Sequence, residues 1–145
     1  MIRVTVHNAH PRLFLPQRGP SRLVREVFRR EGHASGVVSV VMTDDREIRR
    51  INRRFLGHDR PTDVISFPLG EGGAVEGEIY INIDKASRQA RSYRVSLGNE
   101  ITRLVVHGTL HLLGYDDRTA APARRMKKLE DMYVGSLAKR DTVPS

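Results

Sequence analysis

Several residue types and patterns are missing from this sequence of 145 residues. It contains no cysteine, which excludes a disulfide framework, a thiol nucleophile and a cysteine-ligated zinc site. It contains no tryptophan, and aromatic residues make up only 6% of the chain, so a broad stacking platform for nucleic-acid bases is not expected. No apolar run approaches the ~18 residues that span a bilayer, and residues 1–6 alternate apolar with polar, unlike a signal peptide. We therefore expect a cytoplasmic protein with no membrane partner.

Positive charge is in excess. The chain has 25 lysine and arginine residues against 17 aspartate and glutamate residues, a formal net charge of +8. A small domain of this charge suits an anionic partner, RNA or DNA first. Because arginine far outnumbers lysine, a compositional bias of the genome is the alternative explanation.

The length and the 39% of hydrophobic residues fit one compact domain over residues 1–145, without repeats or a linker, and with residues 141–145 expected to fray. The apolar pattern predicts four strands, at 2–6, 37–42, 64–67 and 77–83, and five helices, at 21–31, 45–56, 84–93, 96–113 and from 119 onward. Ser21, Asp44 and Asp84 are expected to cap helices, and Gly57 and Gly114 to end them. This order predicts an α+β fold with one mixed four-stranded sheet packed with about five helices.

The side chains best suited to bind a metal lie in residues 107–117. His107 and His111 are four residues apart on a predicted helix, so both imidazoles leave the same face and can share one divalent metal. Gly114 permits a positive φ, which lets the chain turn back and bring Asp117 toward the histidines. The pattern predicts a metal site at the end of a helix. The alternative is that both histidines are ordinary helix residues.

The spacing H-x-x-x-H-x-x-G-x-x-D is also similar to the metzincin protease motif H-E-x-x-H-x-x-G-x-x-H. Gly108 stands where such a protease has its general-base glutamate, and Asp117 where it has a third histidine. Without the glutamate the peptidase loses its proton acceptor, so a protease is disfavoured.

Four segments of the sequence are similar to motifs of one known protein family. Residues 107–116, H-G-T-L-H-L-L-G-Y-D, are similar to the family signature H-G-x-L-H-L-x-G-Y-D-H. Residues 57–68, G-H-D-R-P-T-D-V-I-S-F-P, are similar to its G-x-D-x-P-T-D-V-L-S-F-P, and residues 77–79 to its G-D-I. The terminal helix, with Met126 and Leu129-Glu130, is similar to its M-x-x-L-E, so the resemblance covers about residues 44 to 134. On these motifs the sequence resembles the YbeY family of bacterial rRNA maturation factors, which are metal-dependent endoribonucleases.

The resemblance implies one zinc ion per chain, held by His107, His111 and Asp117, which are catalytic because the metal activates a water. It also implies cleavage of single-stranded RNA, with a role in 16S rRNA 3′-end maturation and ribosome quality control at the small subunit. Asp117 replaces the final histidine of the family motif; a carboxylate lowers the net charge of a zinc centre from +2 to +1 and widens the choice of metal toward manganese. Asp116 is a competing donor, but it matches the non-ligand aspartate of the family.

Leu56 is a second departure, because the family usually has an arginine there. Arg53, Arg54 or Arg60 are candidates to supply the missing charge. The residues expected to bind substrate are Arg60, Thr62, Asp63, Ser66 and Arg103. Ordinary turn chemistry is the alternative for Thr62 and Asp63, and a solvated helix position for Arg103.

The alternative function is a non-catalytic ribosome- or RNA-binding assembly factor with a structural or degenerate metal site, which the changes at Leu56 and Asp117 favour. Against it, a structural zinc normally has four protein ligands, and only three are identified. We also expect the metal to help hold the fold together. The oligomeric state is not predicted. No role is assigned to His7, His10, His33 or His58.

Overall fold

The computed structural model describes residues 1–13, 18–57, 59–70 and 74–140. His58, to which no role is assigned, and the tail at 141–145, which is expected to fray, lie outside these residues. The elements, in chain order, are β1 (Ile2–Asn8), α1 (Arg18–Arg30), β2 (Gly36–Thr43), α2 (Asp45–Ile51), the π-helical turn η1 (Asn52–Leu56), β3 (Val64–Pro68), β4 (Val75–Asn82), α3 (Ile83–Tyr93), α4 (Leu97–Leu112) and α5 (Ala120–Arg140). The predicted α+β order is confirmed.

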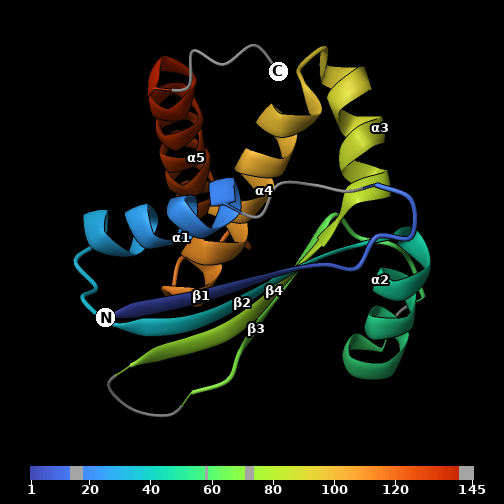
Figure 1. The fold of residues 1–145 in the computed structure, drawn as a ribbon, viewed down its shortest axis with the longest axis horizontal. Coiled ribbons are helices and arrows are strands. Elements are labelled where there is room, and N and C mark those ends of the chain that lie inside the picture. The colour runs from blue at the N-terminus through green and yellow to red at the C-terminus, as the bar shows by residue number, and fades with distance from the viewer. Residues whose placement is uncertain (14–17, 58, 71–73, 141–145) are drawn as a thin grey trace.

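The four strands form one mixed sheet in the order β1-β2-β4-β3 (Figure 1). Strands β1, β2 and β4 run parallel, with Val4 opposite Val38 and Val40 opposite Ile79. Strand β3 is antiparallel to β4, with Val64 opposite Ile81, and it forms one edge of the sheet. The sheet therefore has the mixed character that the sequence predicts.

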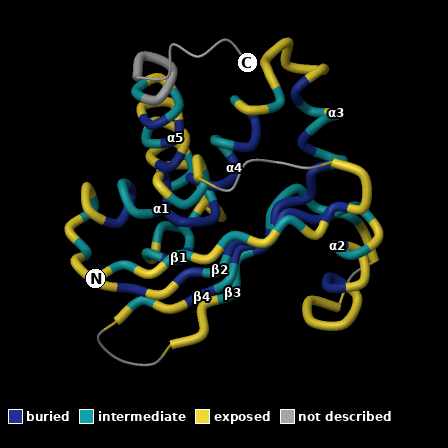
Figure 2. Tube along the Cα trace, viewed as in Figure 1, coloured by how far each residue is buried: buried dark blue, intermediate teal, exposed yellow. Residues whose placement is uncertain are grey.

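The two faces of the sheet are covered unequally. Helices α1, α3, α4 and α5 lie over one face and enclose the main core, while α2 lies at the opposite side, beside the far end of β3 and β4 (Figure 1). Buried positions run along β2 and β4 and along the inner sides of α1 and α4 (Figure 2). The smaller cluster under α2 consists of Ile48, Ile51 and Ile65. No helix in the described ranges is long and apolar enough to cross a lipid bilayer.

Helix α4 is central, because it contacts α1, α3, α5 and the strands β3 and β4. Two glycines allow its close approach to the sheet. A Cβ atom at Gly108 would lie 2.7 Å from Ile79 Cγ2, and one at Gly77 would lie 2.5 Å from Leu112 Cδ2. Real Cβ atoms do not approach other atoms so closely, so the glycines hold one turn of α4 directly against β3 and β4.

Most predicted helix ends are confirmed, but two caps are wrong. Asp44 caps α2 by accepting a hydrogen bond from the Glu47 backbone N–H, as predicted. Ser21 is not a cap, because the described part of α1 already begins at Arg18, and Pro20 is tolerated in a first helical turn. Asn82, not Asp84, caps α3: the strand β4 runs directly into this helix, which places the Asn82 amide oxygen at the Lys85 N–H.

Candidate metal centre

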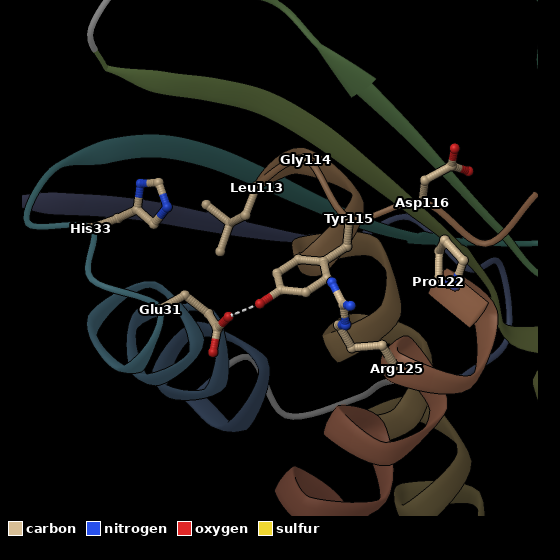
Figure 3. Close-up of a pocket in the computed structure, with 8 residues that line it drawn as sticks. All are labelled: Glu31, His33, Leu113, Gly114, Tyr115, Asp116, Pro122 and Arg125. Atoms are coloured by element: carbon tan, nitrogen blue, oxygen red, sulfur yellow. Dashed lines mark hydrogen bonds between the residues drawn. The ribbon is translucent and has the colours of Figure 1, made fainter.

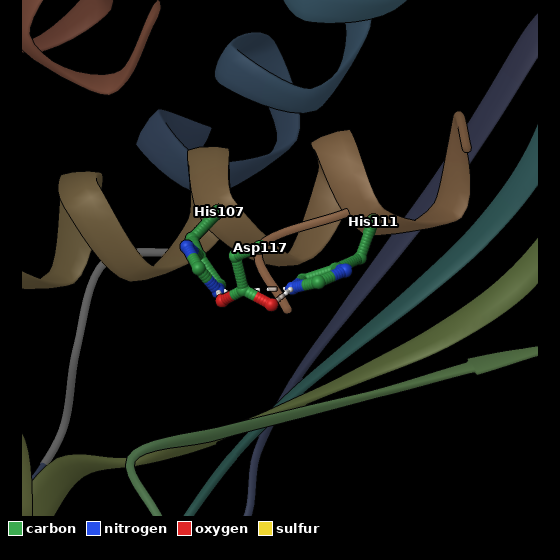
Figure 4. Close-up of side chains that lie close together, drawn as sticks. All are labelled: His107, His111 and Asp117. Carbon is green, nitrogen blue, oxygen red and sulfur yellow. Dashed lines mark hydrogen bonds and ion pairs between the residues drawn. The ribbon is translucent and has the colours of Figure 1, made fainter. Parts of the chain in front are cut away.

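His107 and His111 leave the same face of α4, and Asp117 returns to them after the helix ends (Figure 4). The return is made by Gly114, which has a φ of 99°. Its N–H donates to the His111 carbonyl, and the next N–H, of Tyr115, donates to the Leu110 carbonyl. The predicted left-handed end of the helix is confirmed, and it carries Asp117 to the side of the histidines.

The three side chains present donor atoms around one point. The two Nε2 atoms are 3.1 Å apart, His107 Nε2 is 3.4 Å from Asp117 Oδ2, and His111 Nε2 is 3.5 Å from Asp117 Oδ1. A tetrahedral zinc with bonds of about 2.0–2.2 Å separates its ligand atoms by roughly 3.3 Å. The donor set, two imidazoles and one carboxylate, is also one that zinc accepts. These residues therefore fit a zinc ion in both chemistry and spacing.

Glu130 on α5 orients the first histidine. His107 Nδ1 donates to Glu130 Oε2 at 2.9 Å, which leaves the lone pair of Nε2 facing Asp117 and His111. Burial lowers the pKa of His107, but the hydrogen bond to Glu130 and the negative charges of Glu130, Asp117 and Asp63 outweigh it, so the net pKa is raised. From the sequence, Glu130 was identified only as part of a helix motif. Its position among the apolar residues of that helix could have indicated that its carboxylate faces the interior and has a partner there.

A cavity of about 490 Å³ opens in front of the three residues. Thr62, Asp63 and Ser66, three of the predicted substrate-binding residues, line it together with Leu56. Arg60 and Arg103 are not among its lining residues. Arg103 instead points its guanidinium at α5, 2.8 Å from Asp131 and 3.7 Å from Glu130.

Two buried asparagines hold the segment that carries Thr62 and Asp63. Asn52 Nδ2 donates to the Arg60 carbonyl and to Thr62 Oγ1. Asn82 Nδ2 donates to the Thr62 carbonyl and to Asp45 Oδ1. Sequence reasoning assigned neither asparagine a role, because each bonds to a segment at least eight residues away along the chain.

Ser66 and Gly108 join the sheet to α4, the helix that carries the two histidines. Ser66 Oγ donates to the Gly108 carbonyl at 3.0 Å. Because a Cβ at residue 108 would already collide with Ile79, the side chain of a protease's general-base glutamate has no room there. The structure thus adds a steric reason to the chemical one against a metzincin-like reaction.

On its other side, the loop that carries Asp117 contacts the C-terminal end of α1 (Figure 3). Tyr115 donates its hydroxyl hydrogen to Glu31, and this bond together with burial raises the pKa of the phenol. Asp116 lines the same side and accepts hydrogen bonds from Arg118, at 2.9 Å from its backbone nitrogen and 3.1 Å from Nε. The structure therefore places Asp117, and not Asp116, with the two histidines.

Comparison with known proteins finds relatives that align with most of the chain. The family model described as endoribonuclease YbeY matches residues 15–138. The chain is 39% identical over 131 residues to the endoribonuclease YbeY of Chlorobium phaeovibrioides, covering 90% of this chain and 88% of that protein. It is 35% identical over 143 residues to that of Salinibacter ruber, covering 92% and 91%. The solution structure of TM1509 from Thermotoga maritima superposes with a TM-score of 0.64 at 28% identity, covering 100% of this chain and 97% of that one.

Proposed function

The chain belongs to the YbeY endoribonuclease family, and from this premise we propose that it is a zinc-dependent nuclease that cuts single-stranded RNA. Its role would be in 16S rRNA 3′-end maturation and ribosome quality control, on the small ribosomal subunit in the cytoplasm. The observation that carries the proposal is the convergence of His107, His111 and Asp117, with donor atoms 3.1 to 3.5 Å apart. One zinc ion per chain would be held by these three side chains.

The charge of the cavity supports a requirement for metal. Its walls carry the carboxylates of Asp63 and Asp117, and no lysine or arginine is among the described residues that line it. An RNA phosphate entering this cavity alone would meet like charge in a partly desolvated site. A divalent cation held by His107, His111 and Asp117 would supply the missing positive charge, which would stabilise the charge that develops on the phosphate and activate a water near neutral pH.

The chain's own groups then have distinct tasks. Glu130 fixes the tautomer of His107 through the bond to Nδ1. The Thr62 hydroxyl accepts a hydrogen from Asn52, so its own hydrogen is available to a phosphate oxygen. Asp63, on the cavity wall outside the group of three, is the carboxylate placed to accept a hydrogen bond from water or from a ribose hydroxyl. Arg60 and Arg103, both outside the cavity wall, would serve RNA only where it extends beyond the cavity.

One observation favours the second candidate, a non-catalytic factor that binds ribosomal RNA. Leu56, which is 46% exposed, lines the cavity at the position where the family usually has an arginine. A neutral side chain there leaves the transition state without that cation, so the metal alone would have to compensate the phosphate. Cleavage by the pure protein decides between the two candidates.

The first experiment is elemental analysis of untagged protein purified without chelator, with Asp117→Ala and the matched control Asp116→Ala. We expect about one zinc per chain in the wild type and in Asp116→Ala, and a strongly reduced content in Asp117→Ala. A manganese content instead would reassign the metal but keep the site. Absence of metal from the wild type would overturn the metal-dependent reading.

The second experiment is cleavage of a single-stranded RNA by the metal-loaded protein, with His111→Ala as the inactive variant. We expect loss of cleavage in the variant while its circular dichroism is unchanged. Equal residual cleavage by both proteins would identify a contaminating nuclease. Cleavage of unfolded protein under the same conditions would revive the protease that Gly108 disfavours.

A further inference from the structure

A second groove lies on the other side of the edge strand β3. We call it the aromatic groove; Phe55, Phe67, Tyr80 and Pro68 line it, in a volume of about 470 Å³. The Phe67 ring meets the rings of Phe55 and Tyr80 edge to face, both with centroids 5.9 Å apart. The chain has only eight phenylalanine and tyrosine residues, and three of them gather here.

The outermost of these rings is open to solvent. Phe55 is 61% exposed, although burial of a phenylalanine side chain is favourable. The π-helical turn Asn52–Leu56 carries it, and Gly57, with a φ of 72°, ends that turn. Exposed aromatic surface beside a hollow is typical of a site for a ligand with an apolar face.

The aromatic groove adjoins the cavity lined by His107, His111 and Asp117, which we call the metal cavity, at the end of β3. Successive side chains of β3 alternate between the faces of the sheet, so Ser66 lines the metal cavity and Phe67 lines the groove. Pro68, at the end of the strand, lines both. Phe55 and Leu56 are likewise neighbours in sequence on the walls of the two hollows. An extended ligand that crosses this edge of the sheet can therefore contact the aromatic groove and the metal cavity at once.

The charges around the groove favour a neutral, flat occupant over a phosphate. Two carboxylates, of Glu47 and Glu78, line it. Arg50 is already bonded to Glu47, with Nε–Oε2 and Nη2–Oε1 distances of 3.0 and 2.5 Å. The Arg54 guanidinium lies 5.3 Å from the centre of the Phe55 ring. Aromatic faces attract a nucleobase by stacking, and carboxylates accept hydrogen bonds from base N–H groups.

We propose that the aromatic groove receives one unpaired nucleobase of an RNA whose backbone crosses the end of β3 and enters the metal cavity. This inference rests on the proposed function and adds a subsite to it. A base held between Phe55, Phe67 and the groove wall is turned out of any helix and cannot be paired. The groove thus supplies a physical reason for a preference for single strands, which the metal centre alone does not.

The test measures binding and cleavage of a short fluorescent single-stranded RNA by the zinc-loaded protein. The variants are Phe55→Ala, which removes the ring, Phe55→Tyr, which keeps it, and Tyr93→Ala as a matched control. Tyr93 is similarly exposed, at 60%, but lies at the end of α3 and outside the groove. Each protein is measured on intact RNA and on a series of RNAs that each lack one base.

We expect Phe55→Ala to weaken binding of intact RNA by roughly 5- to 150-fold, the range for loss of one stacked base. Phe55→Tyr and Tyr93→Ala should bind like the wild type. One abasic RNA should bind the wild type as weakly as Phe55→Ala binds intact RNA, and on that RNA the two proteins should be equal. The abasic RNA on which the wild type and Phe55→Ala bind with equal affinity identifies the base that the Phe55 ring contacts.

The possible outcomes distinguish a failure of the groove proposal from a failure of the proposed nuclease function. If the wild type cuts RNA and Phe55→Ala binds and cuts equally well, the groove proposal alone is wrong. If the zinc-loaded wild type neither binds nor cuts RNA, both fail. If Phe55→Ala changes the sedimentation of the protein but not its affinity for RNA, the groove is a contact between copies of the chain and the proposal is overturned.

Discussion

The close contact between α4 and the sheet makes Gly108→Ala the most informative single change. The added Cβ atom would lie 2.7 Å from Ile79 Cγ2, 3.1 Å from Ser66 Oγ and 3.3 Å from Val64 Cγ2. Ile79 is fully buried in the main core and cannot move aside without disturbing its neighbours. The substitution therefore either strains the core or pushes α4 away from β3.

The expected magnitude is a balance of two effects. Overpacking of a well-packed core costs about 1–3 kcal/mol, and alanine gains about 1 kcal/mol over glycine in helix propensity. The net result is a loss of about 1 kcal/mol in the free energy of unfolding, or a Tm lower by roughly 2–4 °C. Gly135→Ala is the matched control, because Gly135 lies in α5 with nothing within 4 Å of the added atom. In Gly135→Ala only the change in helix propensity contributes, so the free energy of unfolding should rise by up to about 1 kcal/mol.

Urea unfolding of both variants, in the presence of a chelator so that metal does not contribute, measures the two effects on one scale. Relative to the wild type, the free energy of unfolding should fall in Gly108→Ala and rise in Gly135→Ala, so that the two variants differ by about 2 kcal/mol. If Gly108→Ala is as stable as Gly135→Ala, α4 does not pack against β3 and β4 as closely as described, and the argument from residue 108 against a protease loses its steric part.

Three further predictions concern the metal centre and the buried charge of α4. Removal of the metal by a chelator should lower the Tm seen by circular dichroism, because the ligands join α4 to the segment around Asp117; an unchanged Tm in metal-free protein would refute this. Glu130→Gln should weaken zinc binding by about 10- to 100-fold in a chelator competition, since it replaces the acceptor of the His107 Nδ1–H; an unaltered affinity would remove Glu130 from the site. Glu100 is buried, and burial raises its pKa. Stability is therefore lost as the pH rises from the ordinary glutamate pKa to the raised one, and it levels off above that. Glu100→Gln should accordingly be more stable than the wild type in urea at pH 7 and lose that advantage near pH 4.

The group of three metal-binding candidates could be predicted because the relevant geometry is local. The spacing of His107 and His111 fixes a common helix face, and Gly114 marks the reversal that brings back Asp117. None of these relations depends on how α4 packs. The sheet and the helices were likewise predicted from periodicity and glycines.

The surroundings of the site depend on contacts between distant segments and were not predictable in the same way. The bond from His107 to Glu130 requires α5 to pack beside α4. Arg103 lies one turn before His107, and the bond of its guanidinium to Asp131 of α5 likewise requires the two helices to pack together. The aromatic content of 6% describes the whole chain, and it could not show that the fold brings Phe55, Phe67 and Tyr80 together in one groove.

The return of Asp117 to His111 after only six residues has a consequence for how the site is assembled. The entropy lost in closing a loop grows with the logarithm of its length, so this closure is among the least costly in the molecule. The segment from His107 to Asp117 therefore needs no completed sheet to bring its three candidate ligands together. During synthesis this segment precedes α5, whose Glu130 then hydrogen-bonds His107 and fixes the orientation of its ring.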